Sequence, residues 1–121
     1  PARGNEIMHE LGICDVLRKT VSRIAAQEGA DKVLRVTVEV GTLSGVVPRF
    51  LADGWEAVTD GTPLAGAEMV VETVEGEAEC LDCGAVFTAN LDDLRCPACL
   101  GRKLTPISGR ELVLKEILLP E

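Results

Sequence analysis

Two Cys-x-x-Cys pairs constrain this chain more than any other feature of its sequence. The first pair is Cys80 and Cys83, and the second pair, twelve residues further on, is Cys96 and Cys99. Two residues between paired cysteines let both sulfurs reach one ion from a tight turn, so the two pairs offer four thiolates. Four thiolates form the closed tetrahedral arrangement of a structural zinc site, which leaves no coordination position for a substrate. The spacing therefore predicts one structural Zn²⁺ ion that is not catalytic.

Two other uses of the cysteines have to be weighed. Rubredoxin-like iron redox carriers hold one iron with four cysteines in similar turns, but such carriers are usually small and rich in aromatic residues. This chain has 121 residues with two phenylalanines, one tryptophan and no tyrosine. A disulfide framework does not suit five cysteines of which four form two tight pairs, and a metal site indicates a reducing compartment. With no secretory signal and no membrane-length apolar run, we expect a cytoplasmic protein.

The charge balance excludes some classes of partner and activity. The formal net charge is -8, whereas binding a phosphate backbone needs clustered lysines and arginines. We therefore expect neither nucleic acid nor a membrane as a partner. The sequence contains a single histidine and neither a GxSxG motif nor a phosphate loop. Because it offers few groups that could catalyse a reaction, we do not expect an enzyme.

The apolar pattern predicts the order helix, strand, helix, strand, cysteine module, strand. A helical stripe at steps of three and four covers residues 7–27. Alternating valines predict a strand at residues 35–40, and Pro48 can open a second helix that reaches about Thr59. Further strands are predicted at residues 67–75 and 112–119. The helical stripe consists of Ile7, Leu11, Cys14, Leu17, Val21 and Ile24.

This order predicts an α+β fold in which the cysteine module is an insertion. Two helices would pack on a small, mainly antiparallel three-stranded sheet, and the insert would be a zinc-ribbon-like module with four cysteine ligands. We assign residues 1–76 plus 109–121 to a helix–sheet nickel-binding domain and residues 77–108 to an inserted zinc-binding domain. The insert has few apolar residues, so metal binding should drive its folding.

His9 is the only histidine of the chain, and it lies between Met8 and Glu10. Seven residues precede Met8, and we interpret them as an added or processed extension, with Met8 as the natural start. In that case the Met8 amine, the His9 imidazole and the backbone nitrogens between them can close a planar chelate, with the Glu10 carboxylate alongside. Nitrogen ligands in a square plane suit Ni²⁺ and Cu²⁺.

Several of these features together resemble a known family. Met8-His9-Glu10 opens an amphipathic helix, Val40-Gly41 ends the first strand, and the double Cys-x-x-Cys insert follows. This combination resembles the hydrogenase nickel-incorporation family (HypA/HybF), and the similarity runs from Met8 to the C-terminus. The resemblance implies a nickel metallochaperone with His9 and Glu10 at the nickel site and the four cysteines at the zinc site.

The resemblance also implies partners. Family members deliver Ni²⁺ to the [NiFe]-hydrogenase large subunit together with a nickel-related maturation GTPase, and some also serve urease maturation proteins. The alternatives are a zinc-ribbon protein-interaction module without nickel delivery and an iron redox carrier. We further expect Cys14 and Trp55 in the core. The four glutamates near the insert should form a solvated edge; they are Glu72, Glu75, Glu77 and Glu79.

Overall fold

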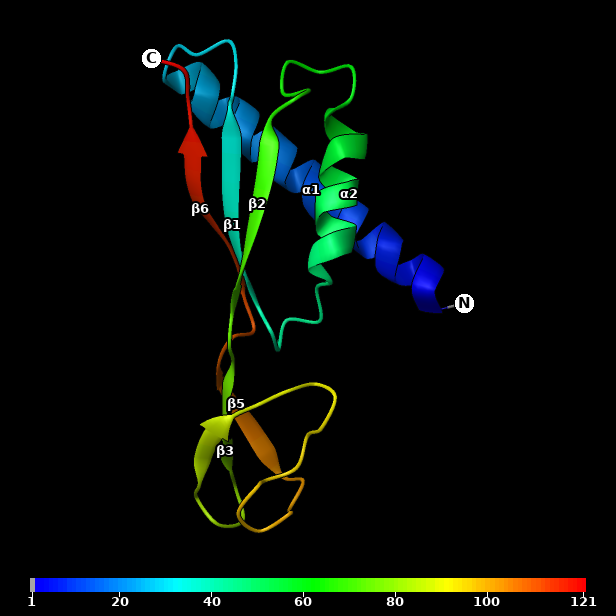
Figure 1. Cartoon of the computed structure of the whole chain (residues 1–121), viewed down its shortest axis with the longest axis vertical. Helices are drawn as coiled ribbons and strands as arrows, with labels where there is room; N and C mark the ends of the chain where they lie inside the picture. The colour runs from blue at the N-terminus through cyan, green and yellow to red at the C-terminus, as the bar shows by residue number, and fades with distance from the viewer. Residues whose placement is uncertain (1) are drawn as a thin grey trace. The chain divides into compact units, whose positions relative to one another are not determined.

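The computed structural model describes residues 2–121, with side chains described from residue 9 onward. Two helices and six strands follow one another along residues 2–121 (Figure 1). They are α1 (Ala2–Gln27), β1 (Arg35–Gly41), α2 (Pro48–Thr59), β2 (Glu68–Val74), β3 (Glu77–Cys80), β4 (Val86–Thr88), β5 (Leu104–Ser108) and β6 (Leu112–Leu118). None of the helices in the described range is long and apolar enough to cross a membrane.

The two helices pack against each other through the predicted apolar stripe. Cys14 and Val21 are fully buried on α1, and Leu51 and Trp55 are buried on α2. Pro48 occupies the first turn of α2, as predicted. The helix α1 begins at Ala2 instead of residue 7, because no proline interrupts the preceding residues. Met8-His9-Glu10 therefore lies within a helix and not at its open end.

The first sheet has the strand order β2-β1-β6 (Figure 1). The backbone of Leu34 accepts from Glu68, and further along Thr42 donates to Val74, so β1 and β2 run parallel. Leu34 donates to Leu118 while Gly41 donates to Glu111, so β1 and β6 run antiparallel. The α+β class is confirmed, but the sheet is mixed and not mainly antiparallel, because α2 carries the chain back across the sheet between two parallel strands.

The second sheet has the order β4-β3-β5 and is antiparallel throughout. Ala78 at its centre is paired with Phe87 on one side and Pro106 on the other. Within residues 77–108, which contain this sheet, the buried side chains are alanines or cysteines: Ala78, Cys80, Ala89 and Cys96. A core of this kind removes little apolar surface from water and gains from a metal.

The chain divides into two compact units. The first unit comprises residues 1–38, 46–72 and 114–121, and the second comprises residues 39–45 and 73–113. The predicted insert, residues 77–108, falls inside the second unit, and its independence as a folding domain stays a prediction. The first unit holds both helices, and Trp55 donates from Nε1 to the Ala67 carbonyl at 3.1 Å within it.

Candidate metal centre

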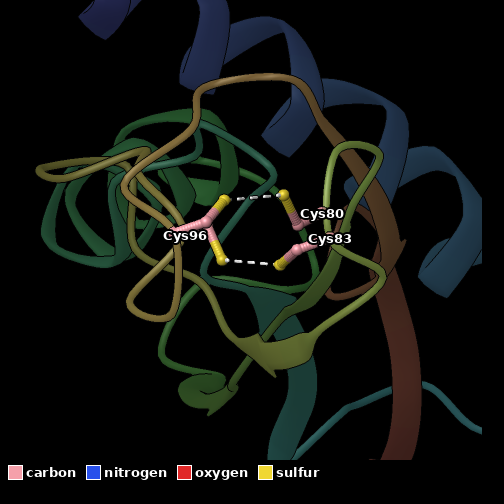
Figure 2. Close-up of side chains that lie close together, drawn as sticks. Cys80, Cys83 and Cys96 are labelled. Carbon is pink, nitrogen blue, oxygen red and sulfur yellow. Dashed lines mark hydrogen bonds between the residues drawn. The ribbon is translucent and has the colours of Figure 1, made fainter.

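The four predicted cysteines come together at one point of the second unit. The sulfurs of Cys80 and Cys99 lie 3.6 Å apart, as do those of Cys83 and Cys96. All four sulfurs lie within 4.8 Å of one another. Figure 2 shows the side chains of Cys80, Cys83 and Cys96 pointing toward a common centre. All five cysteines of the chain are free thiols, so none of these pairs is a disulfide.

This arrangement fits a tetrahedral metal ion. Four sulfurs at about 2.3 Å from a central Zn²⁺ ion are separated from one another by about 3.8 Å. The two shortest sulfur separations, both 3.6 Å, are close to that value. Among the described residues, this is the one group of three or more His, Cys, Asp and Glu side chains that can share an ion.

Each Cys-x-x-Cys pair is held by the same kind of turn. In the first turn Gly84 donates its N–H to the Cys80 carbonyl at 2.8 Å, and in the second Leu100 donates to the Cys96 carbonyl, also at 2.8 Å. Gly84 has φ 79° and Leu100 has φ 63°, so the residue after each pair is left-handed. The left-handed conformation of Leu100 was not predicted, because no residue-type signal marks this position.

Backbone N–H groups face two of the sulfurs. Gly101 donates to Cys99 Sγ at 3.4 Å, and Ala98 donates to Cys96 Sγ at 3.4 Å. The N–H groups of Cys99 and Ala98 lower the pKa of the Cys96 thiol to about 7. Such donors favour the thiolate, which is the form that binds a metal ion.

The predicted nickel residues lie on α1 in the first unit. The His9 side chain is 62% exposed, whereas the neighbouring Glu10 side chain is only 1% exposed. Nδ1 of His9 and Oε1 of Glu10 are 3.1 Å apart. When Nδ1 carries the proton and donates it to the carboxylate, Nε2 is left with a free lone pair facing solvent. The Met8 side chain lies outside the described residues.

Glu10 is an unusual buried carboxylate. Its second oxygen, Oε2, has no hydrogen-bond partner among the described residues. One turn later, Cys14 Sγ donates to the Leu51 carbonyl at 3.1 Å. Burial, with a further contribution from the charge of Glu10, raises the pKa of the Cys14 thiol to about 11. Cys14 is therefore a protonated core thiol, as predicted, and the burial of Glu10 is a feature that sequence reasoning missed.

The close packing of α2 against α1 explains why Glu10 is buried. A Cβ built on Gly54 of α2 would lie 3.2 Å from Cys14 Sγ and 3.7 Å from the Glu10 carbonyl oxygen. Because position 54 lacks a side chain, the two helices approach closely at the turn that carries Glu10. Gly54 inside an apolar helical pattern was the available signal for this approach.

A comparison with known protein families indicates the function of the His9 region and of the four-cysteine centre. The family model described as "Hydrogenase/urease nickel incorporation, metallochaperone, hypA" matches residues 8–119, which include both His9 and the four cysteines. The chain belongs to the HypA family. This assignment favours the metallochaperone over the two alternative functions, and it describes a carrier of nickel in hydrogenase maturation and not an enzyme.

Individual relatives support the HypA assignment over nearly the whole chain. "Hydrogenase maturation factor HypA" of Geobacter metallireducens is 40% identical over 110 residues, which cover 91% of this chain and 97% of that protein. The protein of the same description from Azorhizobium caulinodans is 35% identical over 112 residues, covering 91% and 97%.

Solved structures of HypA proteins share the fold. The solution structure of the Ni metallochaperone HypA from Helicobacter pylori aligns with TM-score 0.63 at 24% identity and covers 91% of this chain and 96% of that one. A second HypA solution structure aligns with TM-score 0.60 at 26% identity, covering 93% and 97%. The described fold is thus that of the HypA family.

Proposed function

We propose that this chain binds Ni²⁺ at His9 and delivers it to the [NiFe]-hydrogenase large subunit. The observation that supports this most is the exposed imidazole of the only histidine, which lies next to the Glu10 carboxylate inside the matched segment. Imidazole is a good ligand for nickel. A site with few protein ligands holds the ion loosely enough for release by ligand exchange.

Glu10 takes part in this proposal as the residue that orients the ring. A carboxylate that accepts from one imidazole nitrogen fixes the ring and raises the basicity of the other nitrogen. The 3.1 Å contact between His9 Nδ1 and Glu10 Oε1 supports that role. Because Glu10 is buried within α1, its carboxylate can join the ion directly only after this part of the helix opens.

Backbone nitrogens would complete the nickel ligands when the chain begins at Met8. In the described helix, which begins at Ala2, the amides of His9 and Glu10 lie well inside α1 and are engaged in the helical hydrogen-bond pattern. The first four N–H groups of a helix have no intrahelical partner. Starting at Met8 would make these amides part of the first turn, beside a free amine, and would leave them available to Ni²⁺.

We propose Zn²⁺ as the resident ion of Cys80, Cys83, Cys96 and Cys99. When bound, it supplies on the order of 10–16 kcal/mol of apparent free energy to a small module of this kind. The four thiolates hold it, and the inward-facing N–H groups of residues such as Ala98 and Gly101 spread their negative charge. All four coordination positions are then filled by protein, so none is left on this ion for a substrate.

Membership of the HypA family supports a proposal about partners. We propose that the chain acts in the cytoplasm with a nickel-related maturation GTPase and that it serves hydrogenase, with urease maturation proteins as a second set of partners. The family description, which names both hydrogenase and urease nickel incorporation, supports this proposal.

Complementation tests the proposed delivery. The host is a Geobacter metallireducens strain that lacks its own HypA, the relative at 40% identity. Hydrogenase activity is measured at limiting nickel with the parent chain, with His9→Ala and with Arg23→Ala, an exposed change further along α1. We expect activity with the parent and with Arg23→Ala, and activity with His9→Ala only after excess nickel is added. Full activity with His9→Ala at limiting nickel would contradict the proposal.

A further inference from the structure

The second unit contains an apolar cavity that neither metal site uses. Its volume is ≈ 360 Å³, and leucines make up much of its wall. Leu91 and Leu94 remain 49% and 47% exposed there. Two arginines, Arg102 and Arg110, line the same cavity. An exposed apolar hollow flanked by cations is a typical recognition surface and not a typical core defect.

The walls of the cavity are preorganised. Ala78, at the centre of the second sheet, lines the cavity and has too small a side chain to fill it. The loop that carries Leu91 and Leu94 is held by Asn90, whose Oδ1 accepts from the Asp92 N–H at 2.8 Å and whose carbonyl accepts from Asp93 at 3.1 Å. A partner would therefore meet a formed surface and lose little free energy in ordering it.

The two arginines are anchored by rigid neighbours. Arg102 directly follows Gly101, which is hydrogen-bonded to the Cys99 sulfur. Arg110 directly follows Gly109, whose carbonyl accepts from the Leu43 N–H at 2.8 Å. Within the described part of the chain, neither guanidinium forms a hydrogen-bonded ion pair with a carboxylate. Arg102 is near enough to Asp93 for its charge to contribute to the lowered pKa of that carboxyl, but Asp93 is bonded to Arg95 at 2.9 Å.

We propose that this cavity is a docking site for an acidic segment of a partner protein that carries an apolar side chain. The apolar side chain would enter between Leu91 and Leu94, and its flanking carboxylates would pair with Arg102 and Arg110. A guanidinium binds a carboxylate through two parallel hydrogen bonds, which gives such a site both charge and geometric selectivity. The chain has a net charge of -8, and two arginines that form no hydrogen-bonded ion pair among the described residues line one apolar hollow. This charge pattern favours an acidic partner.

This docking function is independent of nickel. The cavity lies wholly within the second unit, whereas His9 lies in the first. Loss of nickel binding at His9 would leave the docking proposal intact, and the reverse also holds.

A defined peptide tests the proposal on the full, zinc-loaded chain. The probe is acetyl-Gly-Glu-Glu-Leu-Glu-Glu-Gly-amide, titrated into ¹⁵N-labelled protein while backbone NMR shifts are followed. We expect shifts concentrated at Leu91, Leu94, Arg102 and Arg110. Peptides with serine in place of leucine, or with lysines in place of the glutamates, should bind at least about tenfold more weakly, a difference of about 1.4 kcal/mol.

A matched pair of charge reversals controls for net charge. Arg102→Glu and Lys103→Glu change the charge equally at adjacent positions, but Lys103 does not line the cavity. Arg102→Glu should weaken the peptide at least about tenfold and Lys103→Glu less than about twofold, with thermal melting unchanged in both. Equal loss in both variants, equal binding of the serine peptide, shifts outside the cavity, or displacement of the peptide by equimolar inorganic phosphate would each overturn the proposal.

Discussion

The backbone of Gly41 lies directly against the backbone of Gly109, and a Cβ on Gly41 would overlap the Gly109 carbonyl. The contact belongs to a crossing of three segments in the second unit. Leu43 donates to the Gly109 carbonyl at 2.8 Å, and Thr42 donates to the Val74 carbonyl at 2.9 Å. This crossing explains the glycine after Val40, which formed part of the resemblance to the HypA family.

Gly41→Ala should destabilise the protein strongly. The added methyl group meets backbone atoms that cannot rotate away, so we expect a loss of about 3 kcal/mol, the upper end of the usual range for overpacking. Urea denaturation of the zinc-loaded chain measures this change in the free energy of unfolding. Gly45→Ala is the control: its φ is 80° but its Cβ meets nothing within 4 Å, so it should lose only about 1–2 kcal/mol. A smaller loss for Gly41→Ala than for Gly45→Ala would refute the crossing.

Substitutions at Gly84 and Leu100, the equivalent left-handed positions of the two metal-binding turns, should change stability in opposite directions. Leu100 is left-handed with φ 63° and highly exposed, so Leu100→Gly relieves backbone strain and removes little packing. We expect Leu100→Gly to stabilise zinc-loaded protein by up to about 1 kcal/mol, and Gly84→Ala to destabilise it by about 1 kcal/mol. Competition with a chelator reports both changes. Destabilisation by Leu100→Gly would show that its side chain contributes more than the turn geometry.

Zinc removal should unfold the insert and spare the helix–sheet unit. Within residues 77–108 the buried side chains are alanines and cysteines, such as Ala78 and Cys96, so without the ion the insert lacks a sufficient core. We expect the amides of residues 77–108 to lose hydrogen-exchange protection after chelation, while those of β1 and α2 keep it. Readdition of zinc should restore the protection. Persistent protection of residues 77–108 in metal-free protein would rule out this account.

Cys14 should make stability fall at alkaline pH. Burial, aided by Glu10, raises the pKa of this thiol from 9.0 to about 11. Between these values the unfolded chain releases the proton and the folded chain retains it, so the stabilisation is complete below pH 9 and is lost toward pH 11. The loss should be on the order of 2 kcal/mol. Cys14→Ser keeps a donor for the Leu51 carbonyl but does not ionise, so its pH–stability curve should lack this step; identical curves would contradict the prediction.

Much of the fold could be predicted because it depends on local pattern. Alternation identified Val36, Val38 and Val40, all of which are buried, and helical spacing identified Cys14 and Val21. The alternation failed to predict that Thr37, on the other face of β1, is buried as well. A central strand between β2 and β6 is covered more fully than a single strand pattern reveals.

The sequence was enough to predict which residues belong to each candidate site, but not how deeply they are buried or which backbone conformation they adopt. The Cys-x-x-Cys spacing was enough to group the four sulfurs, because the turn geometry is local. The burial of Glu10 depends on the approach of α2 at Gly54, and the left-handed Leu100 depends on the demand of the metal-binding turn. Both are tertiary constraints that override residue preferences. The cavity between Leu94 and Arg110 likewise arises only when distant segments meet.

The most direct test of the account is the number of nickel ions bound at His9. Zinc-loaded protein starting at Met8 is dialysed against Ni²⁺, and bound nickel is counted by metal analysis in the parent, His9→Ala and Arg23→Ala. The account predicts one nickel ion in the parent and in Arg23→Ala, and none in His9→Ala, with zinc content unchanged in all three. Equal nickel binding in the parent and His9→Ala would contradict it.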